Sequence, residues 1–328
     1  MPSQNFPKIL KLGTRGSALA LVQAGHIKAA LQKKYPNLDI EITIIQTSGD
    51  RFQGARLADA GGKGLFVKEI EEALLDGRID FAVHSLKDLP GILPDDLTLA
   101  CFPKREDPRD CFVSFNYSSL EDLPKGAKVG TSSPRREAQL LALRPDLVVE
   151  PIRGNVETRL KKVEEGFYDA TILANAGLKR LQKENIPRAL LEPDSFVPAV
   201  GQGILGIEIR KSAGDPATPL LAKLLTEALD DSPTSAAARA ERLFLKEMGG
   251  DCYTPLAGHA TVVGNTVAGK EMKMIGWLGM PDGKTFIRAE KIGSTDNPEA
   301  LGHQLAEAIL SQGGKKILHA IATHKSAE

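Results

Sequence analysis

The chain has 328 residues, of which 42% are hydrophobic and 26% charged, and its 42 basic and 42 acidic side chains give a formal net charge of zero. Such a chain can bury a substantial core, and its length favours two or three domains over one. The balanced charge predicts no general attraction to nucleic acid or to an anionic membrane, so we expect anion binding to come from local clusters only.

Strand-like and helix-like patterns alternate through the first two-thirds of the chain, which predicts an α/β fold with largely parallel sheets. In the first unit we expect strands at 8–12, 39–46 and 79–83, and helices at 17–35 and 65–76. The charged stretch 102–110, which contains two prolines, is typical of a linker or hinge.

The same alternation restarts after this stretch. The second unit is expected to contain strands at 111–114, 127–130, 147–152 and 169–173, and helices at 134–143 and 156–165. An apolar run at 204–209 is expected to return the chain to the first unit's sheet. The tail shows a helix at 233–248, several strands and a last helix near 298–311, which predicts a small α+β domain. We therefore expect domain 1 at 1–102 and 200–222, domain 2 at 103–199 and domain 3 at 223–328.

The same arrangement occurs after three predicted strands. In each case small polar residues or glycines follow the strand and precede the start of a helix that contains arginine. The three segments are GTRGS (13–17), GTSSPRR (130–136) and RGNVETR (153–159). Free N–H groups and the helix dipole attract anions at such a start, and arginine binds carboxylates in a bidentate manner. Any one of these sites is equally well explained as a capped helix with solvated arginines. Together they predict an arginine-lined cleft between two α/β domains, for a ligand with several negative charges.

A single acidic residue, Asp88, follows the strand IDFAVHS in the loop SLKDLP. A turn residue before a proline is the simplest explanation. The alternative is a carboxylate at the carboxyl end of a strand, where it balances a positive charge that develops on a substrate and where Lys87 keeps it ionised.

Several apparent motifs predict no site. The GQGILG segment (201–206) matches a dinucleotide fingerprint but opens a strand instead of a helix, and GGKG (61–64) lacks the rest of a phosphate loop. Cys101, Cys111 and Cys252 are too few and too irregularly spaced for a disulfide framework. The histidines form no tight ligand pair, so we expect no metal. Without a signal-peptide pattern or a long apolar run, we expect a cytoplasmic protein with no membrane partner.

Eight segments resemble the porphobilinogen deaminase, or hydroxymethylbilane synthase, family. They occur in the family's order across nearly the whole chain: TRGSALAL (14–21), GGKGLFVKEIEEALLDGRIDFAVHSLKDLP (61–90), REDPRDCFVS (105–114), VGTSSPRREAQL (129–140), IRGNVETRL (152–160), LANAGLKRL (173–181), VGQGILGIE (200–208) and AERLFLKEMGGDC (240–252). The long second segment is highly specific to that family.

The resemblance implies an enzyme that joins four porphobilinogen molecules head to tail, with loss of ammonia, into the linear tetrapyrrole hydroxymethylbilane. It implies two α/β domains similar to periplasmic binding proteins and a third, α+β domain. It also implies a dipyrromethane cofactor, made from the substrate and attached through a thioether to Cys252. The product is expected to pass to uroporphyrinogen-III synthase, and we expect a monomer.

The resemblance also assigns residues. Asp88 is the expected catalytic residue. The expected cofactor-binding residues are Ser17, Lys87, Asp88, Thr131, Ser133, Arg135, Arg136 and Arg159. The expected substrate-binding residues are Arg15, Ser17, Arg153, Arg159, Arg180 and Gln202. The expected lid loop is Gly61, Gly62, Lys63 and Gly64. Two positions depart from the family pattern, since Asp59 replaces a lysine and Asp251 replaces a glycine beside the cysteine.

Two other classes of protein compete with this interpretation. A two-domain clamp that binds a polycarboxylate without catalysis explains the arginines, but it explains neither Cys252 nor the third domain. A hydrolase with a cysteine nucleophile is disfavoured because only His259 lies near Cys252 in the sequence and no motif supports a catalytic triad.

Overall fold

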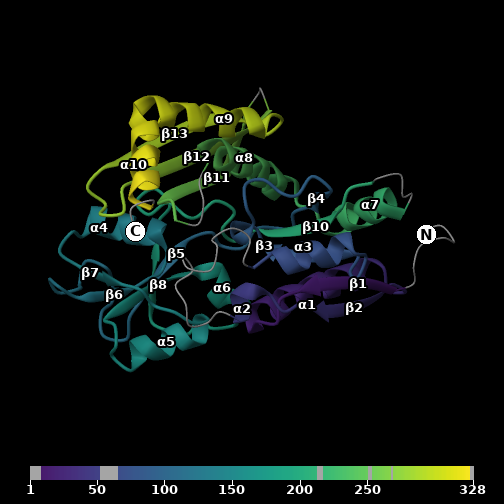
Figure 1. The fold of residues 1–328 in the computed structure, drawn as a ribbon, viewed down its shortest axis with the longest axis horizontal. Helices are drawn as coiled ribbons and strands as arrows, with labels where there is room; N and C mark the ends of the chain where they lie inside the picture. Colours follow the sequence, from purple (N-terminus) through teal and green to yellow (C-terminus); the bar gives the residue numbers. More distant parts are fainter. Residues whose placement is uncertain (1–8, 52–65, 213–216, 250–252, 267–268, 326–328) are drawn as a thin grey trace. The chain divides into compact units, whose positions relative to one another are not determined.

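The computed structural model describes residues 9–51, 66–212, 217–249, 253–266 and 269–325 (Figure 1). The chain divides into two compact units. Unit 1 comprises Met1–Glu106 and Ile204–Ser235, and unit 2 comprises Asp107–Gly203 and Ala236–Glu328. The division falls within the stretch 102–110 that the sequence marked as a linker.

Unit 1 is built on a five-stranded sheet with the order β2-β1-β3-β10-β4. Its strands are β1 (Ile9–Thr14), β2 (Asp39–Ile44), β3 (Phe81–Ser85), β4 (Leu97–Cys101) and β10 (Leu205–Arg210). Its helices are α1 (Ala18–Lys34), α2 (Ser48–Arg51), the 3-10 helix η2 (Leu86–Asp88), α3 (Lys68–Leu75) and α7 (Ala217–Leu229). The strands β2, β1 and β3 run parallel, whereas β10 is antiparallel to both of its neighbours.

Helices cover both faces of this mixed sheet, so its strands are buried on both sides. Alternate residues of β3 point to opposite faces. Phe81 packs with residues of α1 and α7 in one buried cluster, and Ala82 packs with residues of α3 in another. The buried leucines of α7 therefore belong to the core of unit 1.

Unit 2 contains a second five-stranded sheet with the order β7-β6-β8-β5-β9. Its strands are β5 (Asp110–Val113), β6 (Lys128–Gly130), β7 (Val148–Glu150), β8 (Ala170–Ala174) and β9 (Arg188–Leu191). Its helices are α4 (Pro134–Leu143), α5 (Val156–Glu164) and α6 (Asn175–Arg180). This sheet repeats the pattern of the first, because β7, β6 and β8 are parallel and β5 is antiparallel to its neighbours. In each sheet the antiparallel strand is the first one formed after the chain crosses from the other unit.

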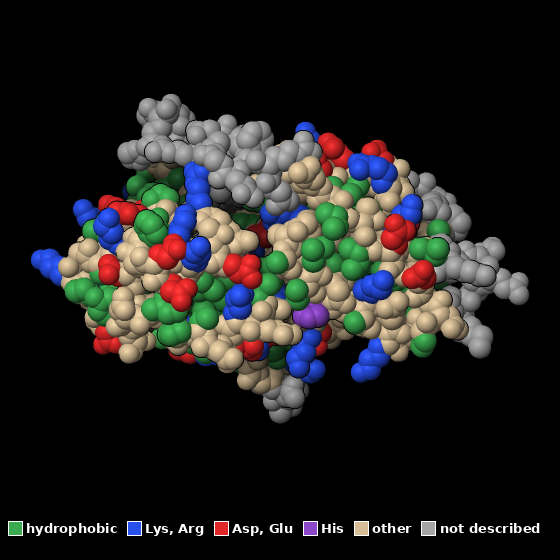
Figure 2. All heavy atoms as spheres, turned by 90° about the horizontal axis from the view of Figure 1, so that it is seen from below, with side chains coloured by type: hydrophobic (Ala, Val, Ile, Leu, Met, Phe, Trp, Pro, Cys, Tyr) green, Lys and Arg blue, Asp and Glu red, His purple; other side chains and the backbone are tan. Residues whose placement is uncertain are grey.

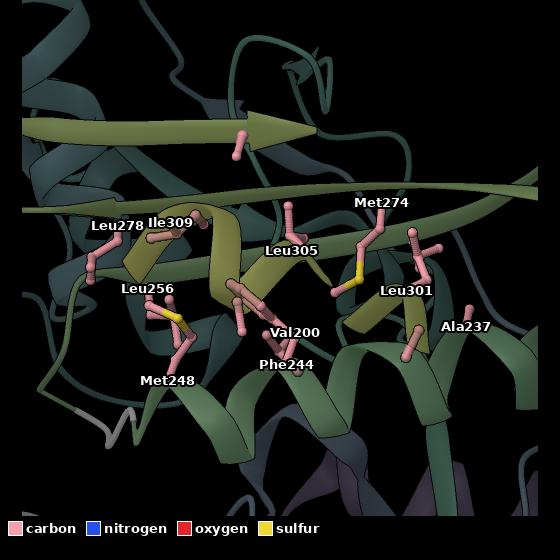
Figure 3. Close-up of a cluster of buried hydrophobic side chains, with 14 of the residues drawn as sticks. Val200, Ala237, Phe244, Met248, Leu256, Met274, Leu278, Leu301, Leu305 and Ile309 are labelled. Carbon is pink, nitrogen blue, oxygen red and sulfur yellow. The ribbon is translucent and has the colours of Figure 1, made fainter. Parts of the chain in front are cut away.

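The rest of unit 2 is an α+β region with an antiparallel sheet ordered β11-β12-β13. Its elements are α8 (Ser232–Met248), β11 (Leu256–Thr266), β12 (Gly269–Gly279), β13 (Phe286–Ser294), α9 (Pro298–Ile309) and α10 (Lys315–Lys325). Figure 3 shows Phe244 and Met248 pointing from α8 into a cluster that also contains Leu305 of α9. At Gly276 of β12 an added Cβ would lie 2.8 Å from Ile309 Cδ1, so glycine permits the close approach of sheet and helix.

The structure confirms the expected fold class, α/β for the two similar sheets and α+β for the tail. It also confirms that the run at 204–209 returns to the first sheet, as β10. Strands β4 and β9 and helices α6, α7 and α10 were not expected. The helix α10 was missed because Gly313 and Gly314 mark a helix end: Gly313 has a φ of 111° and breaks the helical backbone, and α10 begins directly after this kink. The three-domain division remains a prediction. Among the described residues, no helix is long and apolar enough to cross a membrane.

We predict that Phe244→Ala destabilises unit 2 by about 3–5 kcal/mol, because the ring is fully buried and its loss leaves a cavity. Urea denaturation measures the free energy of unfolding. Phe167→Ala is the matched control, since Phe167 is 65% exposed and its loss should change stability by less than about 0.5 kcal/mol. Equal effects of the two substitutions would contradict this description of the core.

Candidate functional site

A pocket in unit 1 lies where β1 and β3 end. It is lined by Arg15, Ser17, Leu19, Ala20, Gln23, Phe66, Val67, Val83, His84, Ser85 and Asp88. Because these two parallel strands are neighbours, the segments that follow them meet at one edge of the sheet. Three residues expected from the sequence, Arg15, Ser17 and Asp88, are therefore brought together.

The basic side of the pocket is formed by the start of α1. The Ser17 side chain caps the helix by accepting a hydrogen bond from Ala20 N at 3.3 Å. The Arg15 guanidinium lies 4.2 Å from the centre of the Phe66 ring, a cation–π contact that orients it without neutralising its charge. A half-buried guanidinium beside a helix N-terminus is suited to binding a carboxylate.

The acidic side is the short turn η2, which carries Lys87 and Asp88 as exposed residues. The flanking leucines hold this turn, because Leu86 and Leu89 are buried and Leu86 N donates to Ile204 O at 3.0 Å. The backbone of the turn is thus fixed to the sheet, while Asp88 is exposed and lines the pocket.

In unit 2, Arg135 and Arg136 begin the helix α4 and share one buried carboxylate, that of Asp110. Arg135 Nη1 donates to Asp110 Oδ2 at 2.7 Å, and Arg136 donates to Asp110 Oδ1 from Nε at 3.1 Å and from Nη2 at 2.7 Å. The two arginines are 5% and 6% exposed, and Asp110 is fully buried. Burial by itself raises the pKa of Asp110, but the two guanidinium charges and their hydrogen bonds outweigh it and hold that pKa well below its usual range.

This arrangement changes the role of the two arginines. The sequence suggested that they project toward an anion, whereas the structure commits most of their hydrogen bonds to the protein. Arg136 Nη1 also donates to Ile172 O at 2.9 Å, and Arg135 Nη1 to Val197 O at 2.8 Å. Nothing local in the sequence identified Asp110, because it lies 25 residues before the arginines.

Arg159 is the cation of unit 2 that is best suited to bind an anionic ligand. It lies on α5, whose first turn is capped by Asn155, and its Nε donates to Gly154 O at 2.9 Å. Burial and, to a smaller extent, the positive charge of Arg136 together lower the Arg159 pKa to about 10. Two guanidinium groups that repel each other in a half-buried site would both be stabilised by an added carboxylate.

The loops around this pair have backbone conformations that the sequence anticipated. Ser133 caps α4 and Thr131 Oγ1 accepts from Ser133 N at 3.2 Å. Gly154 has a φ of 110°, and an added Cβ would lie 2.6 Å from Thr158 Cβ, so only glycine fits there. The half-buried Arg153 precedes it. These residues form a polar rim beside Arg159.

Gln202 and Arg180 are tied to the segment that returns to unit 1. Gln202 is 1% exposed, and its Nε2 donates to Pro108 O at 2.7 Å and to Asp110 Oδ1 at 3.0 Å. Arg180 Nη2 donates to Gly203 O at 2.7 Å. The structure therefore joins Gln202 to the Asp110 cluster, and it joins Arg180 to the backbone next to Gln202.

Sequence reasoning missed Glu241, a fully buried acid on α8. Its Oε2 accepts from Gly201 N at 2.6 Å and its Oε1 from Ala260 N at 2.8 Å. The residue before Gln202 is thereby fixed to the α+β region. Only its place in the segment AERLFL gave a signal, since its spacing on the helix reveals no role.

Cys252, the lid residues Gly61, Gly62, Lys63 and Gly64, and the two departures Asp59 and Asp251 lie outside the described residues. The residues that flank the cysteine segment are described. Met248 and Leu256 belong to the same buried cluster, and Figure 3 shows their side chains close together. Both ends of the segment are thus anchored in one core.

Among the described residues on the face drawn in Figure 2, acidic and basic side chains are interspersed, in keeping with the zero net charge. In the described part of the chain, no group of three or more histidine, cysteine or acidic side chains is placed to hold a metal ion.

Comparison with known proteins matches nearly the whole chain. Residues 10–217 match the family model described as porphobilinogen deaminase, dipyromethane cofactor binding domain, and residues 235–311 match the model of the porphobilinogen deaminase C-terminal domain. The porphobilinogen deaminase of Pelobacter propionicus is 48% identical over 96% of this chain and 98% of its own length. That of Roseiflexus castenholzii is 49% identical over 94% of this chain and 98% of its own length.

Among solved structures, the methionine binding protein MetQ aligns with 67% of this chain and 91% of its own, with a TM-score of 0.40 and 14% sequence identity. A similarity of this size carries no inference about function.

We predict that Asp110→Asn destabilises the protein by about 3–5 kcal/mol at pH 7, because it leaves two buried guanidinium groups without a counter-charge. The folded-state pKa of Asp110 is depressed, so its contribution is present above the unfolded value of about 3.9 and is lost as the pH falls below it. The difference between variant and wild type in urea denaturation should therefore shrink at acidic pH. Glu299→Gln, which breaks an exposed pair with Arg239, should cost at most about 1 kcal/mol. A difference for Asp110→Asn that is small or independent of pH would contradict the assignment.

Proposed function

Because the chain belongs to the porphobilinogen deaminase family, we propose that it joins porphobilinogen molecules head to tail, with release of ammonia, to form hydroxymethylbilane. The observation that carries the proposal is the match of both family domains over nearly the full length. The pocket with Arg15, Ser17 and Asp88 and the rim beside Arg159 support it, since the chemistry needs one carboxylate among cations.

The substrate explains the cations. Porphobilinogen carries an acetate and a propionate, so a growing chain gains two carboxylates with each ring. We propose that substrate carboxylates are bound by Arg15, Ser17, Arg153, Arg159 and Arg180. Guanidinium groups bind carboxylates through two parallel hydrogen bonds, which fix the orientation of each ring as well as its charge.

The loss of ammonia explains the lone acid. When the C–N bond of the aminomethyl group breaks, the substrate becomes a methylene-pyrroleninium cation. A fixed carboxylate in a site with little water stabilises such a cation in the transition state. We propose that Asp88 has this role.

The matched family model is that of a dipyromethane cofactor binding domain. The cofactor supplies a pyrrole α-carbon, the nucleophile with which the chain begins to grow. We propose that Ser17, Lys87, Asp88, Thr131, Ser133, Arg135, Arg136 and Arg159 hold it. The mutual repulsion of Arg136 and Arg159 fits an anionic group, and the buried Arg135 and Gln202 position this site through Asp110.

We further propose that Cys252 attaches the cofactor through a thioether. The other two cysteines are poor nucleophiles. Cys101 and Cys111 are buried, and burial raises the pKa of Cys101 strongly and that of Cys111 to about 12. The proposal has four further parts. We propose that the product passes to uroporphyrinogen-III synthase, that the protein is a monomer, that it is cytoplasmic, and that residues 61–64 form a lid.

Intact mass of the purified protein tests the attachment. We expect an excess equal to two pyrrole units, absent from Cys252→Ala and retained in the matched control Cys111→Ala. The thiol of Cys111 is fully buried, so it should play no part in attachment. The proposed linkage would be contradicted by an unmodified but active wild type, or by an excess mass that is still present in Cys252→Ala.

Asp88→Asn tests the catalytic role. The residue is exposed, so we expect the urea midpoint to be unchanged while turnover of porphobilinogen falls by about 10²–10³-fold. Asp95→Asn, another exposed acid of unit 1, should leave turnover near that of the wild type. If Asp88→Asn keeps wild-type turnover, Asp88 has no part in the chemistry.

A further inference from the structure

A buried histidine lies in the wall of the Asp88 pocket and has no role in the chemistry described so far. His84 lies four residues before Asp88 on β3 and is among the residues that line the pocket. Its Nε2 lies 2.9 Å from Oε2 of Glu208, and the two side chains are 4% and 0% exposed. This pair is thus a close contact between an acid and a base in the interior of unit 1.

The strand register explains how the pair forms. His84 lies opposite Gly206 on the antiparallel strand β10, and Glu208 lies opposite Ala82. Residues two apart on a strand share a face, so His84 and Glu208 are diagonal neighbours on the face that α3 covers. Neither of the residues directly opposite them, Gly206 and Ala82, is large enough to fill the space that the imidazole and the carboxylate use.

The surroundings make His84 the natural partner of Glu208. Within the described residues, neither the Glu208 oxygens nor His84 Nε2 has a well-aligned hydrogen bond, so the two groups meet as a close contact at 2.9 Å. Glu71 of α3 is the other acid nearby. Burial raises the Glu71 pKa, Glu208 raises it further, and His84 lowers it. A buried carboxylate needs such a partner, because transfer of an unpaired charge out of water is costly.

The other charged groups around this pair are accounted for. Glu69 of α3 accepts a hydrogen bond from Ser48 N at 2.8 Å, and Arg210 of β10 donates to Ile79 O at 2.9 Å. In the pocket itself, the charged residues of the lining are Arg15 and Asp88.

The arrangement resembles a carboxylate–histidine pair in which the histidine acts as a base. When Nε2 carries the proton that faces Glu208, Nδ1 is left as the acceptor nitrogen. The charge of the nearby carboxylate then stabilises the imidazolium that forms when Nδ1 takes up a proton. His84 is among the residues that line the pocket, and a role as a base requires that a ligand bound there pass a proton to the ring directly or through one water.

The proposed condensation requires such an acceptor. The C–N bond of a protonated aminomethyl group breaks, and its electron pair leaves on ammonia. The π electrons of a pyrrole α-carbon form the new C–C bond. The α C–H bond then breaks, its electron pair restores the aromatic ring, and its proton must move to a base before it reaches ammonia or water.

We propose that His84, held by Glu208, is the base that accepts this α-proton in the Asp88 pocket. The proposal rests on the proposed function and adds a second role to the site. Asp88 stabilises the cation before the C–C bond forms, and His84 removes the proton after it forms. The two roles can therefore be separated by an isotope experiment.

The test uses porphobilinogen that carries deuterium at its free α-carbon, with His84→Gln, Glu208→Gln and wild-type holoenzymes of confirmed cofactor mass. For His84→Gln we expect kcat to fall by about 10²-fold or more and the deuterium isotope effect on kcat to rise above the wild-type value, because proton removal becomes slow. Glu208→Gln should change both quantities in the same direction but less, since the ring keeps its place and loses only its charge partner.

The matched control is His259→Gln. His259 is also a buried histidine beside a buried acid, with Nδ1 at 3.8 Å from Glu241 Oε1, but it belongs to unit 2 and is no part of the pocket's lining. Its isotope effect should equal that of the wild type. A His84→Gln enzyme with the wild-type kcat, or one with a reduced kcat and the wild-type isotope effect, would overturn the proposal. Failure of the proposed function itself would look different, because the wild type would then make no tetrapyrrole.

Discussion

The arginine site of unit 2 depends on one buried carboxylate. Asp110 is the first residue of β5, where the chain enters its second sheet, and it is bonded to Arg135, Arg136 and Gln202. These partners come from the start of α4 and from the segment that returns to unit 1. One side chain therefore fixes three segments that are far apart in the sequence, and the cost of leaving two guanidinium groups unpaired makes the arrangement rigid.

The same segment is held a second time by Glu241. Its carboxylate binds Gly201 N and Ala260 N, so the return segment, the helix α8 and the strand β11 form one unit. The helix α8 ends at Met248, and Met248 and Leu256 flank the cysteine segment in one core. Buried polar contacts thus extend from the arginines of α4 to the region that carries the proposed attachment cysteine. In our proposal this rigidity keeps the positive charge of Arg136 and Arg159 in place for carboxylates.

Local signals in the sequence were sufficient to predict much of the candidate site. Helix starts were predicted at the ends of three strands, and Ser17, Ser133 and Asn155 cap the helices there, because capping depends on residues only three positions apart. The sequence also predicted that Arg15, Ser17 and Asp88 follow strand ends, and the parallel pairing of β1 and β3 brings them to one pocket.

Pairs of side chains that lie far apart in the sequence could not be predicted. Asp110 with Arg136 and His84 with Glu208 are pairs that only the folded sheets create, across 26 residues in the first case. In both pairs a charged residue occupies a position that a hydrophobic pattern would assign to the core. The sequence therefore identified Arg135 and Arg136 as cations but could not show that an internal carboxylate already binds them. The short strand β9, which lies between two prolines, gave no alternating pattern long enough to be recognised.

The most direct test of the account is the ratio of ammonia released to porphobilinogen consumed by the purified wild-type protein, with the pyrrole product identified by mass. A deaminase that builds hydroxymethylbilane predicts one ammonia for each porphobilinogen and a linear tetrapyrrole as the product. Porphobilinogen that is bound without release of ammonia would contradict the account and would favour a polycarboxylate-binding protein that uses the same arginines without catalysis.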